Sequence, residues 1–202
     1  FLTGACYNEG LCLSAADPAR HSGAVERLKS YLPIAARFDA ILVVGLLQGL
    51  ASDEPDAEVA RMRIAAGLRE VGLAAVDAGV ELVVEPINHL QVGFHHSVGE
   101  VRELVAEIDV SAFKLMVDTI HMNIEETSLV EPIRTCGAAL KHVHLCESNG
   151  ALLGSGHIDF HSVLAALDEI YYAGFASVKV YRKAKFRAAA ASSLEFLLSQ
   201  RG

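Results

Sequence analysis

The chain has 202 residues, of which 52% are hydrophobic and 21% are charged, and its formal net charge is −8 at pH 7. This length suits one domain with a sizeable core. The negative charge argues against a nucleic-acid partner, which would need a basic surface. The apolar runs are shorter than the roughly 20 residues that span a bilayer, and the first residues do not have the pattern of a secretory leader. We therefore expect a single domain over residues 1–202 that is cytoplasmic, contacts no membrane and acts on a small molecule.

Short apolar runs typical of buried strands recur along the chain and are separated by amphipathic helical patterns. The runs are continuously apolar rather than alternating, as in a parallel sheet that helices cover. Their spacing leaves room for one crossover helix after each strand. The sequence therefore predicts repeated βα units. The predicted strands cover, in chain order, residues 1–5, 40–45, 80–86, 113–118, 140–145 and 175–181.

Polar residues fall where four of these strands end, at Glu85, Asp118, His144 and Lys179. In a (β/α)₈ barrel the strand ends converge on one face, where active sites are built. No glycine-rich phosphate motif follows the first strand, which disfavours a nucleotide-binding open sheet, although an open sheet of six strands stays an alternative. Because a closed barrel needs eight strands and the chain begins at Phe1 rather than methionine, we expect that about two N-terminal βα units are absent from it.

Three of these residues form a candidate metal site. Glu85, Asp118 and His144 offer two carboxylates and one imidazole, a donor set that suits Mn²⁺, Co²⁺, Mg²⁺ or Zn²⁺. The alternative is that each side chain pairs separately with a nearby cation or backbone amide, since acids at strand ends are common without a metal. The residue types alone leave both interpretations open.

The other histidines are assigned no direct role. Of His142 and His144, we expect only one to face the barrel axis, and we expect His142 to pack outward against a helix. His95 and His96 lie in a loop after the strand that ends at Glu85. We expect both loop histidines to be solvated rather than functional.

Four motifs occur along the chain in a definite order: EPIN (85–88), DTIHMNIEE (118–126), HVHLCESN (142–149) and GSGHIDF (154–160). Together they resemble the xylose isomerase-like TIM barrel superfamily of sugar isomerases and epimerases, and most of all the ketose 3-epimerases of the D-tagatose and D-psicose type. The resemblance implies a (β/α)₈ barrel without its first two βα units and an isomerase of carbohydrate metabolism. It also implies a divalent metal ion, Mn²⁺ ahead of Co²⁺, Mg²⁺ or Zn²⁺. A homodimer and a homotetramer are open alternatives for the assembly.

The same resemblance assigns roles to individual residues. It implies that Glu85, Asp118 and His144 bind the metal ion and that His121 contacts the substrate. Glu147, which follows His144 closely, matches a further family position, so we expect it to contact a substrate hydroxyl group or to support the site.

Three positions depart from the family pattern. Lys179 stands where the family has a glutamate that serves as metal ligand and second base. Gly150 replaces a substrate-binding arginine. The segment NHLQ (88–91) replaces NR-x-E, so Gln91 takes the place of a carboxylate and is expected to contact the sugar. These departures bear on both the chemistry and the substrate.

Epimerisation next to a ketone needs two proton-transfer groups on opposite faces of the carbon and a cation for the enediolate. Glu85 can be one of these groups, and Lys179 the other if burial and a nearby cation lower its pKa. In a second hypothesis the Lys179 ammonium supplies the positive charge in place of a metal. In a third, Lys179 extends outward or pairs with an acid such as Glu147. The sequence leaves these three hypotheses open.

We therefore predict a metal-dependent sugar isomerase or epimerase that acts on a small ketose through an enediolate. One alternative is an inosose-type dehydratase on the same fold. Another is a catalytically silent sugar-binding barrel, because Lys179 and Gly150 replace expected site residues. A DNA-repair endonuclease of the same superfamily is disfavoured by the net charge of −8.

Overall fold

The computed structural model describes residues 2–182 and 184–200. The chain divides into two compact units, Phe1–Leu115 and Met116–Gly202. The boundary falls inside strand β3 (Phe113–Asp118), so the two ends of this strand belong to different units. Among the described helices, none has the length and apolar character needed to cross a membrane.

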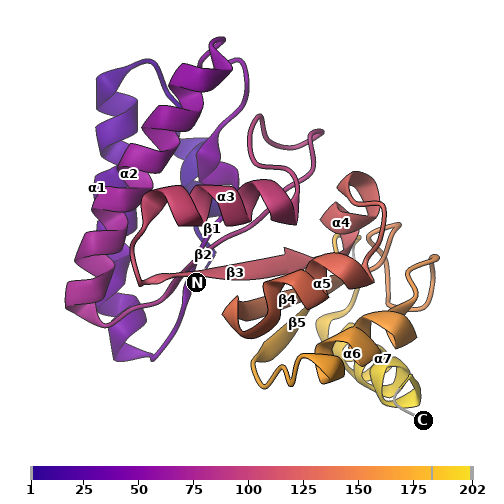
Figure 1. Ribbon diagram of the computed structural model, residues 1–202. Helices are drawn as coiled ribbons and strands as arrows, with labels where there is room; N and C mark the ends of the chain where they lie inside the picture. Colours follow the sequence, from indigo (N-terminus) through magenta and orange to yellow (C-terminus); the bar gives the residue numbers. More distant parts are fainter. Residues whose placement is uncertain (1, 183, 201–202) are drawn as a thin grey trace. The chain divides into compact units, whose positions relative to one another are not determined.

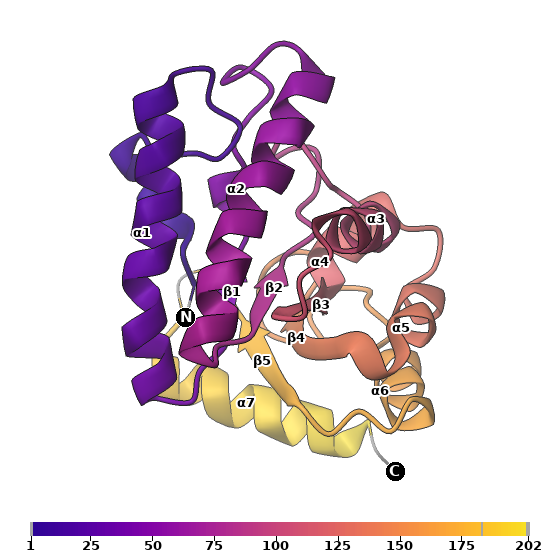
Figure 2. The same cartoon turned by 60° about the vertical axis from the view of Figure 1, so that its left-hand side comes forward.

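The first unit alternates helices with short parallel strands, and helices α1 and α2 lie side by side in both views (Figures 1 and 2). Leu42 of β1 is paired with Leu82 of β2, and Leu82 is paired with Phe113 of β3. The elements of this unit before β3 are η1 (Gly4–Glu9), α1 (Pro18–Arg37), β1 (Leu42–Val44), η2 (Leu46–Gln48), α2 (Ala57–Ala78), β2 (Leu82–Val84) and α3 (Val98–Ile108).

The helices of the first unit begin at side chains that can accept hydrogen bonds from free backbone N–H groups. The Asp17 carboxylate accepts from Ala19 N at 2.9 Å at the start of α1, and Asp56 caps α2 in the same way. At α3 the Ser97 hydroxyl and the Glu100 carboxylate cap each other's backbone N–H groups, which is a capping box. The strands β1 and β2 are entirely buried.

The second unit contains the end of β3 and a parallel pair of strands, with His144 beside Ser177 and Cys146 beside Lys179. Helices α5 and α6 pack against each other. In contrast to the strands of the first unit, β5 is largely exposed, and Phe175 is 84% exposed. The elements after β3 are α4 (Thr119–Glu125), α5 (Val130–Cys136), η3 (Gly137–Ala139), β4 (Leu140–Cys146), α6 (Phe160–Glu169), β5 (Phe175–Lys179) and α7 (Phe186–Ser199).

Five of the six predicted strands are confirmed, as is the alternation of parallel strands with helices. The prediction for residues 1–5 is wrong over its described part, and Phe1 lies outside the described residues. Leu2 makes only an isolated bridge with Val43, and Gly4 already begins η1. The hydroxyl and the backbone N–H of Thr3 both donate to the Val43 carbonyl, at 2.9 and 3.3 Å. The chain therefore leaves the edge of β1 after a single bridge.

Candidate active site

The candidate site of the second unit is built around Asp118, the last residue of β3. Its side chain is completely buried. The Oδ1 atom accepts a hydrogen bond from Ile120 N at 3.1 Å, so Asp118 is also the N-cap of α4. The sequence places an acid where a strand passes directly into a helix, because one carboxylate oxygen can satisfy the helix start.

The Oδ2 atom of Asp118 faces three basic groups. Lys179 Nζ lies 2.7 Å from it and donates a hydrogen bond. His144 Nδ1 lies at 3.3 Å and His121 Nε2 at 3.9 Å from the same oxygen. Both histidines are buried. The structure thus brings together Asp118, His144 and Lys179, which the sequence placed near the ends of three strands, and His121, which the sequence placed in the motif of residues 118–126.

The electrostatic environment keeps Asp118 ionised. Burial alone would raise the pKa of this carboxyl group, but the hydrogen bond with His144 and the positive charge of Lys179 outweigh burial. The net result is a pKa far below the usual range for aspartate. A buried carboxylate of this kind requires a compensating cation.

Lys179 is held on the site side of β5. Its side chain is 20% exposed, and Nζ lies 5.3 Å from the centre of the Tyr181 ring, within cation–π range. The interpretation in which Lys179 extends outward is therefore wrong. The pairing with Asp118 agrees with the first two hypotheses for the lysine and with the part of the third in which Lys179 pairs with an acid, and that acid is Asp118.

His144 faces the site, but the expectation that His142 packs outward against a helix is wrong. Their ring centres are 5.0 Å apart in an edge-on arrangement, because residues two apart on a strand point to the same face. Ser177 Oγ lies 3.1 Å from His142 Nε2. His142 is thus a neighbour of the site histidine.

Glu147 follows β4 and is completely buried. Its Oε1 atom accepts from the backbone N–H groups of Ser148 at 2.8 Å and Ile158 at 3.1 Å. Its Oε2 atom accepts from Gly154 N at 2.9 Å. Burial raises the pKa of Glu147, but these backbone donors outweigh it and the net pKa is lowered. The carboxylate therefore holds the loop of residues 148–158 in place through these three hydrogen bonds.

Two predicted site residues belong to the first unit. Glu85 follows β2 and is buried, and its backbone N–H donates to the Val44 carbonyl at 2.8 Å. A Cβ atom at Gly45 would lie 2.8 Å from Glu85 Oε2, so the glycine makes room for this carboxylate. Gln91 is exposed in the loop that follows.

The sequence analysis did not predict a network of buried polar side chains beside Glu85. Gln48 Nε2 donates to the Glu85 carbonyl at 3.2 Å, and Gln48 Oε1 lies 2.8 Å from His95 Nδ1. Since Oε1 can only accept, His95 donates from Nδ1. His95 is buried, so the expectation that it is solvated is wrong. Burial is the main reason that its pKa falls to about 4, and its backbone has a positive φ of 54°.

The donor atoms of the second unit fit a divalent metal ion. Metal bonds to nitrogen and oxygen are about 2.0 to 2.2 Å long, so ligand atoms of one ion lie about 3 to 4 Å apart. The 3.3 Å separation from Asp118 Oδ2 to His144 Nδ1 is in this range. A carboxylate oxygen and an imidazole nitrogen are donors that suit Mn²⁺, Co²⁺ or Zn²⁺. Lys179 is the unusual member because it brings a positive charge to the same oxygen.

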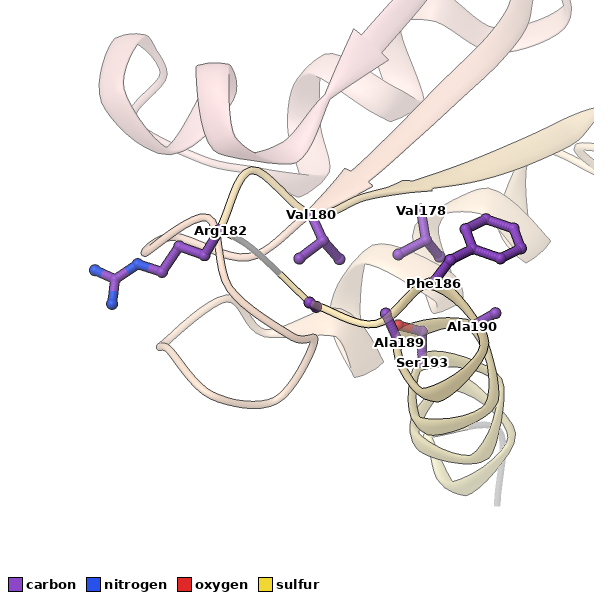
Figure 3. A pocket seen from close by; sticks show the side chains of 8 residues that line it. Val178, Val180, Arg182, Phe186, Ala189, Ala190 and Ser193 are labelled. Atoms are coloured by element: carbon purple, nitrogen blue, oxygen red, sulfur yellow. The ribbon is translucent and has the colours of Figure 1, made fainter.

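A separate pocket lies between β5 and α7 (Figure 3). Its volume is about 350 Å³. Side chains alternate between the faces of a strand, so Val178 and Val180 face this pocket while Lys179 faces the candidate site. In Figure 3 the Arg182 side chain extends away from the apolar part of the lining. The lining residues are Val178, Val180, Arg182, Ala184, Phe186, Ala189, Ala190 and Ser193.

Comparison with known proteins identifies the class. Residues 2–200 match the family of xylose isomerase-like TIM barrels, and the chain belongs to this family. The barrel fold and the family inferred from the four motifs are thereby confirmed. The number of βα units absent from the chain and the single-domain organisation stay predictions.

Individual relatives are epimerases of sugars. The chain is 33% identical over 180 residues to D-psicose 3-epimerase of Enterocloster bolteae, a match that covers 86% of this chain and 58% of that protein. It is 35% identical over 108 residues to D-psicose 3-epimerase of Agrobacterium fabrum, covering 54% of this chain and 37% of that protein. The chain thus spans little more than half of the first relative and about a third of the second.

Solved structures show the same likeness. A structure of L-ribulose 3-epimerase is 26% identical, with a TM-score of 0.84 and coverage of 94% of this chain and 72% of that chain. D-psicose 3-epimerase with D-tagatose from Clostridium cellulolyticum H10 is 26% identical, with a TM-score of 0.82 and coverage of 93% and 74%.

Proposed function

We propose that this protein is a sugar epimerase or isomerase that moves a proton next to the carbonyl group of a small ketose, through an enediolate. The observation that carries the proposal is the convergence of Lys179, His144 and His121 on a single buried oxygen of Asp118. The sugar 3-epimerases among the relatives supply the substrate class.

Asp118 and His144 would hold a divalent metal ion, together with Glu85 of the first unit. Mn²⁺ is the proposed ion, with Co²⁺, Mg²⁺ and Zn²⁺ as alternatives. When bound, such an ion stabilises the negative charge that develops on the substrate oxygens. The ionised state of Asp118 at neutral pH suits this role, because metal ligands must be deprotonated.

The chain's own residues would handle the protons. Glu85 would take the proton from the carbon next to the carbonyl, and Lys179 would return one to the opposite face. His121 would donate a hydrogen bond to a substrate hydroxyl group, and Gln91 would contact the sugar from its loop. For Glu147 we propose an indirect contribution, since its carboxylate holds the loop of residues 148–158.

The proposal is tested by isotope exchange. The protein is incubated with D-psicose, D-tagatose or L-ribulose and Mn²⁺ in D₂O, and deuterium at the carbon beside the carbonyl is followed by NMR. We expect incorporation with the wild-type protein and a loss of at least about 100-fold with Asp118→Ala, since removing a group needed for charge stabilisation typically has this effect. The matched control is Lys141→Met, which alters an exposed lysine of β4.

Three results would count against the proposal. Sugar binding without exchange would indicate a silent binding domain. A product that has lost water would indicate a dehydratase. Equal exchange by the wild-type and Asp118→Ala proteins would show that the site around Asp118 does not carry the reaction.

A further inference from the structure

We propose that the Lys179 ammonium competes with a divalent ion for Asp118 Oδ2 and must leave this oxygen before the ion can bind. This inference rests on the proposed metal site and concerns how this chain regulates that site. It makes Lys179 an internal competitor of the metal ion.

The competition follows from the sharing of one oxygen. Lys179 Nζ lies 2.7 Å from Asp118 Oδ2, which is the same atom that His144 Nδ1 meets at 3.3 Å and His121 Nε2 at 3.9 Å. The carboxylate is completely buried and carries one negative charge. A divalent ion on this oxygen would stand within a few ångströms of the ammonium, where like charges repel strongly because little water screens them.

A second partner for the displaced ammonium is already present. Nζ lies 5.3 Å from the centre of the Tyr181 ring, and an aromatic face stabilises an ammonium group. The Lys179 side chain is 20% exposed, so a rotation of its flexible stem brings Nζ nearer to water without unfolding β5. The Tyr181 ring can thus stabilise the Lys179 ammonium when the ion is bound.

The position of Tyr181 is fixed by Gly150. The Gly150 carbonyl accepts from the backbone N–H groups of Tyr181 at 2.9 Å and Arg182 at 3.0 Å. Gly150 has a positive φ of 67°, and a Cβ atom there would lie 3.3 Å from the Tyr181 side chain. A larger residue at position 150 would therefore disturb the ring beside Lys179. Gly150 and Lys179 thus both lie against Tyr181.

The test measures Mn²⁺ affinity by isothermal titration calorimetry on the full chain at constant pH and ionic strength. We expect Lys179→Met to bind Mn²⁺ about 10- to 100-fold more tightly than the wild-type protein. We expect the control variant Lys141→Met, which removes the same charge from an exposed position on the neighbouring strand, to bind as the wild type does. Tyr181→Leu removes the second partner and should weaken Mn²⁺ binding several-fold.

If Lys179→Met does not fold, Mn²⁺ affinity is measured with Lys179→Gln instead, because its amide can still donate a hydrogen bond to Asp118. It too should bind Mn²⁺ more tightly than the wild type. Near-ultraviolet circular dichroism checks the fold of each variant.

Two outcomes overturn the inference and can be told apart. If the wild-type protein and the Lys179 variants bind Mn²⁺ with equal affinity, Lys179 does not compete, while the metal site of the proposed function stands. If none of these proteins binds Mn²⁺ and all are folded, the inference and the metal-assisted part of the proposed function both fail.

Discussion

Thr119 and Cys146 exchange two hydrogen bonds through a single hydroxyl group. Thr119 Oγ1 donates to the Cys146 carbonyl at 2.7 Å and accepts from the Cys146 N–H at 2.8 Å. The two residues follow or end the strands that carry Asp118 and His144. The threonine side chain therefore replaces a backbone hydrogen bond between the two strands, close to Asp118 and His144.

Replacing Thr119 with valine should destabilise the protein with little change of shape. The N–H and C=O groups of Cys146 lose the hydrogen bonds with the Thr119 hydroxyl, which costs about 2 to 4 kcal/mol of unfolding free energy. Urea unfolding followed by circular dichroism measures this. The control Thr119→Ser keeps the hydroxyl and should lose no more than about 1.5 kcal/mol, the loss expected for a methyl group. Equal stability of the two variants would contradict the role assigned to the hydroxyl.

Asp118 should make the protein sensitive to acid. Its pKa is lowered in the folded state, so its contribution to stability is present above the unfolded-state pKa and is lost as the pH falls toward the folded-state pKa. The unfolded-state pKa is about 3.9. We expect the stability difference between the wild type and Asp118→Asn to shrink by about 1 kcal/mol from pH 5 to pH 3. A difference that stays constant over this range, in urea unfolding at each pH, would refute the prediction.

His95 should add a pH dependence at higher pH. Its folded-state pKa is about 4 and its unfolded-state pKa is about 6.5, so the unfolded chain binds the extra proton between these values. Stability therefore falls as the pH falls through this window, by about 2 to 3 kcal/mol between pH 7.5 and pH 4.5. In His95→Asn this part of the dependence should disappear, and asparagine tolerates the positive φ at this position. Parallel pH profiles of the two proteins would show that His95 is not the group responsible.

Glu147 should control the mobility of the loop of residues 148–158. In Glu147→Gln one acceptor oxygen and the negative charge are lost, and a hydrogen bond to a charged group contributes about 1.5 to 3 kcal/mol. We expect hydrogen exchange of peptides that contain Gly154 and Ile158 to become at least about tenfold faster. The control Glu195→Gln changes an exposed carboxylate on α7 and should leave the exchange rate as it is. Unchanged exchange in both variants would mean that the loop is held by other contacts.

The sequence by itself determined the alternation of βα units, the family and the identity of the polar residues at strand ends. Strand and helix signals are local, because apolar periodicity and capping side chains act within a few residues of one another. For this reason β3 was predicted with its observed bounds, and the acid at its end was recognised as a site residue. The strand prediction for residues 1–5 failed because Leu2 makes only an isolated bridge and a short helix already begins at Gly4, which apolar periodicity does not reveal.

The tertiary structure decided which atoms meet. Lys179 and Asp118 are 61 positions apart, and the sequence leaves three roles open for Lys179 because it contains no distance between the two residues. The shared face of His142 and His144 and the inward position of His95 also became visible only in three dimensions. Burial and the position of neighbouring charges set the pKa of a side chain. These quantities depend on residues brought together from distant parts of the chain, so they belong to the folded molecule.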